Sequence, residues 1–240
     1  MYKNYIFDLY GTLVDIRTDE EQQEVWEKLR LFYGYYGACW MPEEMRVAYK
    51  RLVDCGEDAG DTHEAYPEIQ IDQVFRALFT EKGVVPSEEL VLHAGQFFRV
   101  LTTGYLRLYE GVPGMLEQLR AQGKKLYLLS NAQKIFTAYE LQLLDIAKYF
   151  DGILISSDYG VKKPDLRFFE VLLEKYHLDP KECVMIGNDE RSDIVGAAKA
   201  GMDSFYIHSN ISPECSGPVH ATYVNMSMDM EQIWKEVTEL

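Results

Sequence analysis

Eight polar side chains that could carry out chemistry lie in four clusters along this chain, and each cluster closely follows a short apolar run. Carboxylates can act as nucleophiles or hold a hard cation, hydroxyl and amide groups can hold an oxyanion, and lysine adds a positive charge. Together they could form a single catalytic site. The clusters are Asp8 and Tyr10, then Ser130 and Asn131, then Lys163, and finally Asn188, Asp189 and Asp193.

Each of these side chains taken alone also has a purely structural explanation. Asp8 could be a turn residue, Ser130 a helix N-cap, Lys163 a solvated lysine, and Asp189 a partner for a helix dipole. All four lie in order at the ends of apolar runs, however, and four independent structural coincidences are improbable. We therefore favour a shared site.

Short apolar runs with flanking polar residues or glycines predict buried parallel strands that end at these clusters. Helical stripes lie between them, at 112–119, 168–176 and 194–201. This alternation predicts an α/β fold with a doubly wound parallel sheet, whose carboxyl edge is where ligands bind. The predicted strands are 5–7, 126–129, 153–155, 184–186 and 205–207, with a sixth around 223–224.

One stretch interrupts the alternation, because residues 16–108 contain no convincing buried strand. Amphipathic helical segments at 74–79 and 90–101 fill it instead, Ser87 is a candidate N-cap, and 55–61 is predicted to be a loop. We expect a catalytic α/β core made of 1–15 and 109–240, with 16–108 inserted as a helical cap over the end of the first strand.

At this point the chain resembles the haloacid dehalogenase (HAD) superfamily of hydrolases, over nearly the whole predicted core. Four motifs carry the resemblance, and they read FDLYGTLVD, LLSN, GVKKPD and IGNDERSDIVGAAKAGM, with EGVPGM ahead of the second. The resemblance implies a HAD-like Rossmannoid core, and it implies that the insertion is a C1-type cap.

The resemblance also implies roles for the clustered residues. Asp8 would be the nucleophile that forms a covalent aspartyl intermediate, while Ser130, Asn131 and Lys163 would bind the oxygens of the transferred group. Mg²⁺ would be held by oxygens at the edge of the sheet. The implied metal ligands are Asp8, the backbone carbonyl of Tyr10, and the fourth cluster with Asn188, Asp189 and Asp193.

Tyr10 departs from the pattern of the family's phosphatases, which have an aspartate general acid and base at this position. A tyrosine with its ordinary pKa near 10 exchanges protons poorly at neutral pH. General acid–base catalysis typically raises the rate by ~10²- to 10⁴-fold, and this contribution would be lost. Slow turnover of ordinary phosphomonoesters would follow, unless the leaving group is a weak base. A tyrosine here also matches the dehalogenase branch, and it could equally be a packing residue against the cap.

The fourth cluster departs from the pattern as well. Asn188 stands where the family places its first acid, counting five residues back from Asp193, whereas Asp189 supplies an acid at a spacing of four. The leading metal ligand is therefore open between these two residues. Asp193 could also be a partner for Lys163 or a first-turn acid of the following helix.

Three functions follow from these features. We favour a Mg²⁺-dependent phosphohydrolase acting on a small phosphorylated metabolite. A metal-independent 2-haloacid dehalogenase is the alternative, although that branch has a different fourth motif and an aromatic hydroxyl where this chain has Phe169. A catalytically weakened binding or regulatory protein is the third. The dehalogenase would also need a cap arginine, for which the candidates are Arg30, Arg46, Arg51 and Arg99.

The amino-acid composition limits the classes of binding partner that are expected. The chain has 240 residues, is 47% hydrophobic and carries a formal charge of −15, which argues for a globular protein and against nucleic acid or membrane surfaces as partners. Four scattered cysteines without metal-ligand spacing are expected to be reduced thiols. We expect a cytoplasmic protein with a small-molecule substrate, and no residue pattern indicates an oligomeric state.

Overall fold

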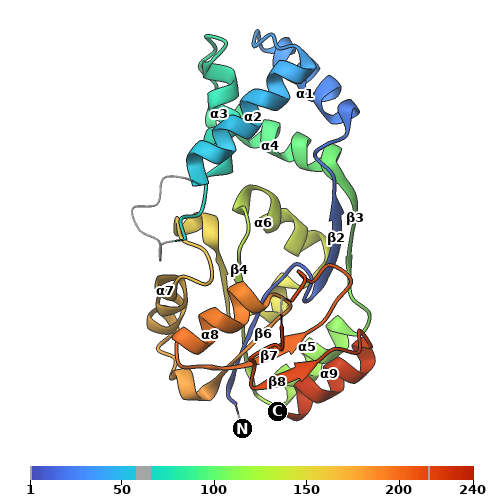
Figure 1. Ribbon diagram of the computed structural model, residues 1–240, viewed down its shortest axis with the longest axis vertical. Helices are drawn as coiled ribbons and strands as arrows, with labels where there is room; N and C mark the ends of the chain where they lie inside the picture. Colours follow the sequence, from blue (N-terminus) through green and yellow to red (C-terminus); the bar gives the residue numbers. More distant parts are fainter. Residues whose placement is uncertain (1, 58–65, 216) are drawn as a thin grey trace.

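A six-stranded, fully parallel sheet forms the lower half of the molecule in the computed structural model (Figure 1), which describes residues 2–57, 66–215 and 217–240. The strand order is β5-β4-β1-β6-β7-β8, with crossovers on both sides of β1. This confirms the predicted fold class. The strands are β1 (Asn4–Phe7), β4 (Lys125–Ser130), β5 (Gly152–Ile155), β6 (Cys183–Gly187), β7 (Asp203–Ile207) and β8 (Tyr223–Asn225).

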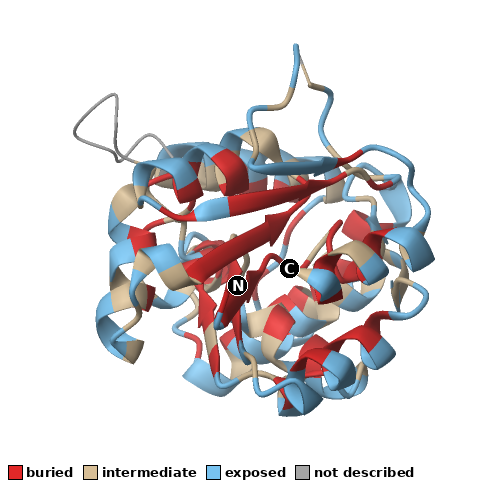
Figure 2. Ribbon diagram, turned by 90° about the horizontal axis from the view of Figure 1, so that it is seen from below, coloured by how far each residue is buried: buried red, intermediate tan, exposed pale blue. Residues whose placement is uncertain are grey.

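Helices cover both faces of this sheet, and alternate residues of β1 divide between them as a strand of period two requires. Phe7 packs into the hydrophobic cluster that contains Leu116 and Trp234, whereas Ile6 packs into the one that contains Phe168. The central strands β1 and β6 are buried between the two layers, whereas the edge strand β8 is largely exposed (Figure 2). The helices of this half are α5 (Val112–Ala121), α6 (Lys134–Leu143), α7 (Leu166–Tyr176), α8 (Val195–Lys199) and α9 (Met230–Glu239), with short turns η1 (Ala147–Tyr149), η2 (Ser156–Asp158), η3 (Pro180–Glu182) and η4 (Glu190–Ile194).

The upper half is a helical bundle with its own hydrophobic cluster, which includes Trp26, Phe75 and Phe98 (Figure 1). Its helices are α1 (Gln23–Tyr35), α2 (Pro42–Glu57), α3 (Ile71–Thr80) and α4 (Glu88–Thr102). Ser87 caps α4 as predicted, because its hydroxyl accepts a hydrogen bond from the Leu90 amide at 3.1 Å. In the described part of the chain, no helix combines the length and the apolar character needed to cross a membrane.

Two sequence-based expectations about this region were wrong. The predicted loop at 55–61 begins inside α2, which continues to Glu57, and 58–61 lie outside the described residues. The insertion is also not purely helical, because β2 (Val14–Thr18) pairs antiparallel with β3 (Thr103–Leu108). Only the start of β2 is buried and β3 is half-exposed, so neither strand has the continuous apolar run that identified the core strands.

Asp15 ties this two-stranded ribbon to the core. Its nearly buried carboxylate accepts hydrogen bonds from Arg107 at 2.7 Å, from Tyr105 at 3.1 Å and from Asn210 at 3.0 Å. Burial alone would raise the pKa of Asp15, but the three donors outweigh it and lower the pKa. The carboxylate therefore stays ionised and joins both strands to the loop after β7.

The helical bundle rests on α6 of the core. Ile135 and Phe136 of α6 pack against the bundle's own hydrophobic cluster. Gly95 of α4 makes this contact possible, since a Cβ there would lie 2.5 Å from the Ile135 Cδ1 atom. Arg99 of α4 forms an ion pair with Glu140 of α6 at 2.6 Å. The bundle is thus held to the core by apolar packing and by a partly buried charge pair.

Candidate active site

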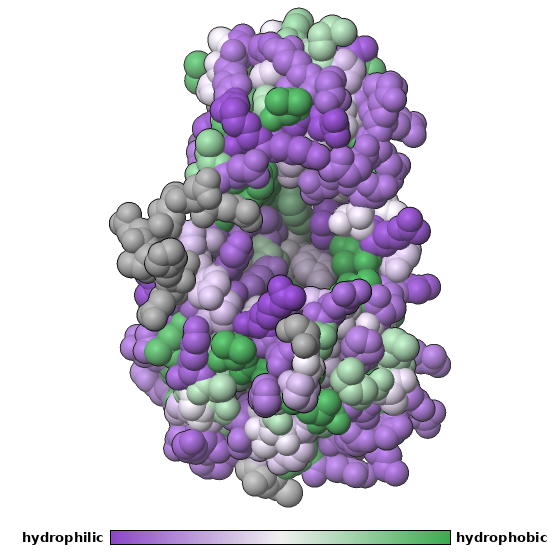
Figure 3. Space-filling model, viewed as in Figure 1, coloured by the Kyte–Doolittle hydropathy of each residue, from purple (hydrophilic) through white to green (hydrophobic). Residues whose placement is uncertain are grey.

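The four clusters meet at the carboxyl edge of the sheet because β4, β1 and β6 are neighbours. Phe7 pairs with Leu128 on one side and with Ile186 on the other, so the residues that follow these strands lie side by side. The molecule is hollowed between its helical and α/β halves (Figure 3). At this edge lies a cavity of about 290 Å³, and its lining residues are Asp8, Tyr10, Asn131, Lys163, Asn188, Asp189, Ser192, Asp193, Ile211 and Pro213.

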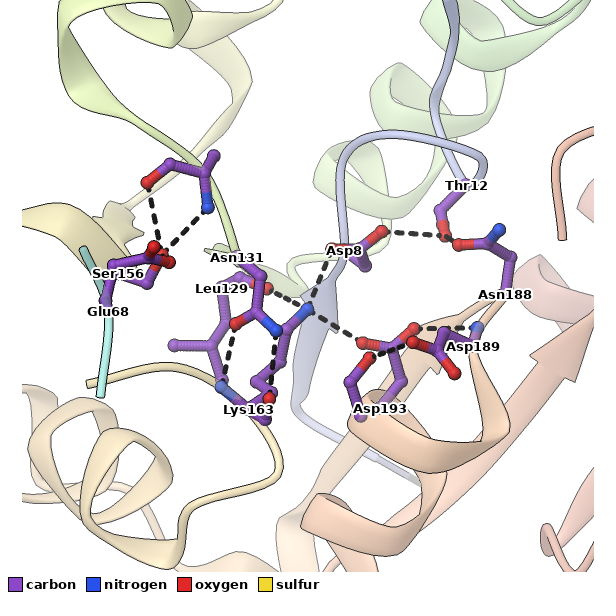
Figure 4. Close-up of polar contacts among 12 residues, drawn as sticks. Asp8, Thr12, Glu68, Leu129, Asn131, Ser156, Lys163, Asn188, Asp189 and Asp193 are labelled. Atoms are coloured by element: carbon purple, nitrogen blue, oxygen red, sulfur yellow. Dashed lines mark hydrogen bonds and ion pairs between the residues drawn. The ribbon is translucent and has the colours of Figure 1, made fainter. Parts of the chain in front are cut away.

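Lys163 is the centre of the site (Figure 4). Its ammonium group donates to Asp8 Oδ1, to Asp193 Oδ1 and to the Leu129 carbonyl oxygen, each at 2.7 Å, so all three of its hydrogens are used. Burial would lower the pKa of Lys163, but the charges of Asp193 and Asp8 outweigh it and raise the pKa. Lys163 is therefore a buried cation that fixes Asp8 in place.

The second oxygen of Asp8 faces Thr12, a residue that the sequence analysis did not single out. The Thr12 hydroxyl lies 3.4 Å from Asp8 Oδ2 and 3.3 Å from Asn188 Oδ1, so one hydroxyl lies next to both a carboxylate oxygen and an amide oxygen (Figure 4). Gly11 permits this approach, because it has a φ of +84° and a Cβ there would lie 2.2 Å from Asn188 Nδ2.

Asp189 and Asp193 are engaged in other contacts. The Asp189 carboxylate accepts from the Arg191 amide at 2.9 Å and from the Ser192 hydroxyl at 2.8 Å, and so caps η4. Asp193 uses its second oxygen to accept from the Asp189 amide at 3.0 Å. Burial, reinforced by the charge of Asp8, raises the pKa of Asp193 against the opposing effect of Lys163. In the described residues, no three His, Cys, Asp or Glu side chains form a metal-binding group.

The two residues of the second cluster, Ser130 and Asn131, have different surroundings. The Ser130 hydroxyl is fully buried at the end of β4, has no hydrogen-bond partner and does not line the cavity. The Asn131 amide instead binds the backbone of Lys163, accepting from its N–H at 2.7 Å and donating to its carbonyl at 2.9 Å (Figure 4). Asn131 therefore holds the Lys163 loop in place.

The helical bundle reaches the same loop just before α3. The Glu68 amide donates to the Gly160 carbonyl at 3.1 Å, and the Lys162 amide donates to the Tyr66 carbonyl at 2.9 Å. The Glu68 carboxylate accepts from the buried Ser156 hydroxyl (Figure 4). The loop that carries Lys163 is therefore fixed from both halves of the molecule.

Tyr10 lines the cavity, but its hydroxyl is directed to α6. The phenol donates to Glu140 and lies 2.9 Å from the Thr137 hydroxyl, while the Arg99 guanidinium lies 5.7 Å from the centre of its ring. Burial raises the pKa of Tyr10, and the charge of Glu140 raises it further. Sequence reasoning missed Glu140, because a glutamate on a helix is normally exposed and its partner Arg99 is distant in the chain.

The candidate cap arginines do not reach the cavity. Arg46, Arg51 and Arg99 each pair with a glutamate, at 2.7, 2.6 and 2.6 Å. Arg30 has no ion pair with any residue that the structure describes, and none of the four lines the cavity. Phe169 is fully buried in the cluster between the sheet and α7. None of these residues forms the arginine and hydroxyl pair that a dehalogenase would need.

The amino-acid sequence is similar to a known protein family and to several characterised proteins. A model of the haloacid dehalogenase-like hydrolases matches residues 2–201. A glyceraldehyde 3-phosphate phosphatase of Methanothermobacter thermautotrophicus is 27% identical over 172 residues, covering 72% of this chain and 73% of that protein. A phosphoserine phosphatase of Thermus thermophilus is 31% identical over 143 residues, covering 60% of this chain and 56% of that protein.

Among solved structures, a 2-haloacid dehalogenase of Pseudomonas syringae pv. Tomato has a similar fold. It superposes with a TM-score of 0.66 at 21% sequence identity, covering 99% of this chain and 99% of that one. At this level of identity the likeness concerns the architecture, and chemistry must be argued from the site itself.

Proposed function

The chain belongs to the haloacid dehalogenase-like hydrolases, and on that premise we propose that it is a Mg²⁺-dependent phosphohydrolase acting on a small phosphorylated metabolite. The observation that carries the proposal is the position of the Asp8 carboxylate, which lies between the buried ammonium group of Lys163 and the amide oxygen of Asn188. Lys163 holds one carboxylate oxygen, and the other faces the amide oxygen of Asn188 across Thr12. The phosphatase names of two relatives also support it.

Asp8 is the nucleophile in this proposal. A carboxylate oxygen of Asp8 attacks phosphorus, the bond from phosphorus to the leaving oxygen breaks, and a covalent aspartyl phosphate results. Ser130, whose hydroxyl has no protein partner, donates to a phosphoryl oxygen, and Lys163 supplies positive charge beside it. Water then attacks the phosphorus of the intermediate and regenerates the Asp8 carboxylate.

The residues present fit a magnesium ion. Asp8 Oδ2 and Asn188 Oδ1 are hard oxygen donors that both lie next to the Thr12 hydroxyl, and together with the Tyr10 carbonyl they would hold Mg²⁺. When bound, the ion offsets the repulsion between the Asp8 carboxylate and a phosphate dianion. We leave Asp189 and Asp193 out of this ligand set, because hydrogen bonds within the protein occupy both oxygens of each.

The same proposal assigns a role to each half of the molecule. Residues 1–15 and 109–240 form the catalytic core, and 16–108 form a cap that encloses the substrate. The separate hydrophobic cluster of the helical bundle supports this division, as do its contacts with α6 and with the Lys163 loop. The substrate is a small molecule, since the cavity of about 290 Å³ suits a compact ligand.

A panel of phosphorylated metabolites and 2-haloacids, assayed with Mg²⁺ and again with a chelator, tests the proposed function. We expect phosphate release that needs Mg²⁺ and stops with the chelator. Halide release without metal would replace the proposal by the dehalogenase alternative. Absence of both activities, with a folded protein, would favour a binding or regulatory role.

The choice of metal ligand gives a separate prediction. Asn188→Ala should weaken Mg²⁺ binding by at least about tenfold, because loss of even an indirect partner typically costs ~10- to 100-fold in metal affinity. Asn188→Asp should strengthen binding, since a carboxylate is a stronger ligand for Mg²⁺. Titration calorimetry measures both changes.

Asp189→Asn is the matched control for this prediction. The asparagine can still cap η4, and the change removes a charge from the same loop without touching the proposed ligands. It should leave Mg²⁺ affinity within about threefold. The ligand assignment is wrong if Asp189→Asn abolishes binding while Asn188→Ala does not.

A further inference from the structure

A polar network joins the loop that carries Asp8 to the helical bundle. Its first member is Tyr10, whose hydroxyl donates to Glu140 and lies 2.9 Å from the Thr137 hydroxyl, both on α6. Glu140 is only 6% exposed and also accepts two hydrogen bonds from Arg99 of α4, at 2.6 and 3.2 Å. The network therefore links the active-site loop, a core helix and the bundle.

The side chains of this network hold one another in a single geometry. Oε1 of Glu140 accepts from Arg99 Nε, and Oε2 accepts from both Arg99 Nη2 and the Tyr10 hydroxyl. A forked pair of hydrogen bonds from a guanidinium fixes the orientation of a carboxylate as well as its distance. The Arg99 guanidinium also lies 5.7 Å from the ring centre of Tyr10 and 5.2 Å from that of Phe136.

Tyr10 lies in the turn that follows the proposed nucleophile. On either side of it, the Leu9 carbonyl accepts from the Val14 amide at 2.9 Å, and the Gly11 amide donates to the Val14 carbonyl at 2.8 Å. Gly11 has a φ of +84°, and glycine has the least restricted backbone of all residues. The hydrogen bonds of the Tyr10 phenol fix this turn to α6.

Arg99 lies where the bundle joins the core. It is in the last turn of α4, and its carbonyl accepts from the hydroxyl of Thr103 at 2.6 Å. Thr103 begins β3 and pairs with Thr18 of β2. At this junction α4 and α6 face each other (Figure 1). A shift of the bundle against α6 therefore pulls on Glu140 and, through it, on Tyr10.

We propose that Glu140 is a positioning residue of the active site, which holds Tyr10 in place and makes that position depend on the helical bundle through Arg99. The inference rests on the proposed function and deepens it, because it names what sets the geometry of the loop around the nucleophile. Tyr10 lines the cavity and Glu140 does not, so Glu140 acts through Tyr10. Reaction rates depend steeply on the alignment of the reacting groups.

A double-variant cycle between Glu140 and Tyr10 tests this inference. Glu140→Gln keeps the shape of the side chain but loses its charge and one acceptor oxygen, and Tyr10→Phe keeps the ring but loses the hydroxyl. Each change should lower kcat by ~10- to 100-fold. KM should stay within about threefold of the wild-type value, because the ring that lines the cavity remains.

The double variant decides whether the two residues act together. If Glu140 acts through Tyr10, Glu140→Gln should cause no further loss of kcat in the Tyr10→Phe background. If the two losses multiply, Glu140 acts independently of Tyr10 and the inference is wrong. Wild-type kcat in Glu140→Gln would overturn it as well.

Mg²⁺ affinity is a second measurement, and it does not depend on turnover. The Tyr10 carbonyl is a proposed ligand, so releasing the Tyr10 side chain should weaken Mg²⁺ binding. We expect a loss of about tenfold in calorimetric titrations of Glu140→Gln and of Tyr10→Phe, and the same loss in the double variant. Unchanged Mg²⁺ affinity in both single variants would contradict the inference.

Arg99→Gln tests the link to the bundle. It should lower kcat by about tenfold in the wild-type background and cause no further loss in Glu140→Gln, where the pair is already broken. An equal loss in both backgrounds would show that Arg99 does not act through Glu140. If Glu140→Gln does not fold, Arg99→Gln and Tyr10→Phe form the cycle, and their losses should again not multiply.

Glu117→Gln is the matched control. Glu117 of α5 accepts a hydrogen bond from the Tyr149 hydroxyl at 2.8 Å, and neither residue lines the cavity, so the same kind of contact is weakened elsewhere. This variant should keep the wild-type kcat and Mg²⁺ affinity. A loss of kcat as large as that of Glu140→Gln would show that the effect is not specific, and the inference would be wrong.

Failure of the proposed function can be told apart from failure of this inference. If the wild-type protein releases phosphate from no substrate of the panel, the proposed function fails and the inference fails with it. If the wild type is active and Glu140→Gln is equally active, the proposed function stands and only the inference fails. Thermal unfolding checks that each variant is folded.

Discussion

Asp8→Asn should lower the turnover rate by about 10⁴-fold or more while leaving the fold intact. An amide cannot act as the nucleophile, yet it has the shape of the carboxylate and can still accept the hydrogen bond from Lys163. Phosphate release measures the loss, and thermal unfolding checks that the variant is folded. Near-full activity in the purified variant would show that Asp8 is not the nucleophile.

A matched control lies at the opposite end of the same sheet. Asp203 begins β7 and accepts hydrogen bonds from Tyr2 at 2.8 Å and from Thr222 at 3.1 Å, one on each carboxylate oxygen. An asparagine can accept one of these bonds through its oxygen and donate from its NH₂ group to the other hydroxyl. Asp203→Asn should therefore retain wild-type turnover. Loss of activity in both variants would point to a general effect of removing a carboxylate.

Lys163→Met should have the largest effect on stability, and it should also remove activity. The change leaves Asp8 and Asp193 as neighbouring carboxylates in a buried site, with no cation between them. Removing one partner of a buried ion pair typically costs about 3–5 kcal/mol in the free energy of unfolding. Urea unfolding of the variant and the wild type measures the difference.

The pH dependence of this loss follows from the raised pKa of Asp193. A carboxyl group whose pKa is higher in the folded state favours folding when it is protonated, and this advantage is lost as pH rises towards the folded pKa. Without Lys163 the pKa of Asp193 rises further. The destabilisation should therefore shrink when the pH is lowered from about 8 to about 5.

A double variant distinguishes charge repulsion from lost packing. Adding Asp193→Asn to Lys163→Met removes one of the two unpaired carboxylates and should recover part of the lost stability. If the double variant is no more stable than Lys163→Met, the loss comes from packing around the lysine stem. Asp193→Asn alone completes the cycle.

The core strands could be predicted from the sequence because each is a continuous apolar run that ends at a polar cluster. The two-stranded ribbon of β2 and β3 could not be predicted in this way. Strand β2 contains Arg17 and Thr18 on an exposed segment, and β3 begins with Thr103 and Gly104. Such strands are stabilised by pairing with each other, which depends on contacts distant in the chain. Apolar runs therefore reveal the sheet that is buried and miss the one that is half-exposed.

The sequence predicted which clusters of polar residues form the candidate site, but not the individual contacts that each residue makes. Spacing along the chain left the choice of metal ligand open between Asn188 and Asp189, and it could not show that the Asp189 carboxylate caps η4. Glu140 was missed for a similar reason, since it becomes a buried partner of Tyr10 only through the packing of α6 against α4.

The ribbon of β2 and β3 also bears on how such a protein can change over evolution. Thr18 pairs with Thr103, so the chain leaves the α/β half and returns to it at adjacent points. A hairpin turn of a few residues could join the two strands directly, and insertions are tolerated best where chain ends already meet. The helical bundle can therefore be exchanged or enlarged as a module, with compensating changes needed at its contacts with α6 and with the Lys163 loop.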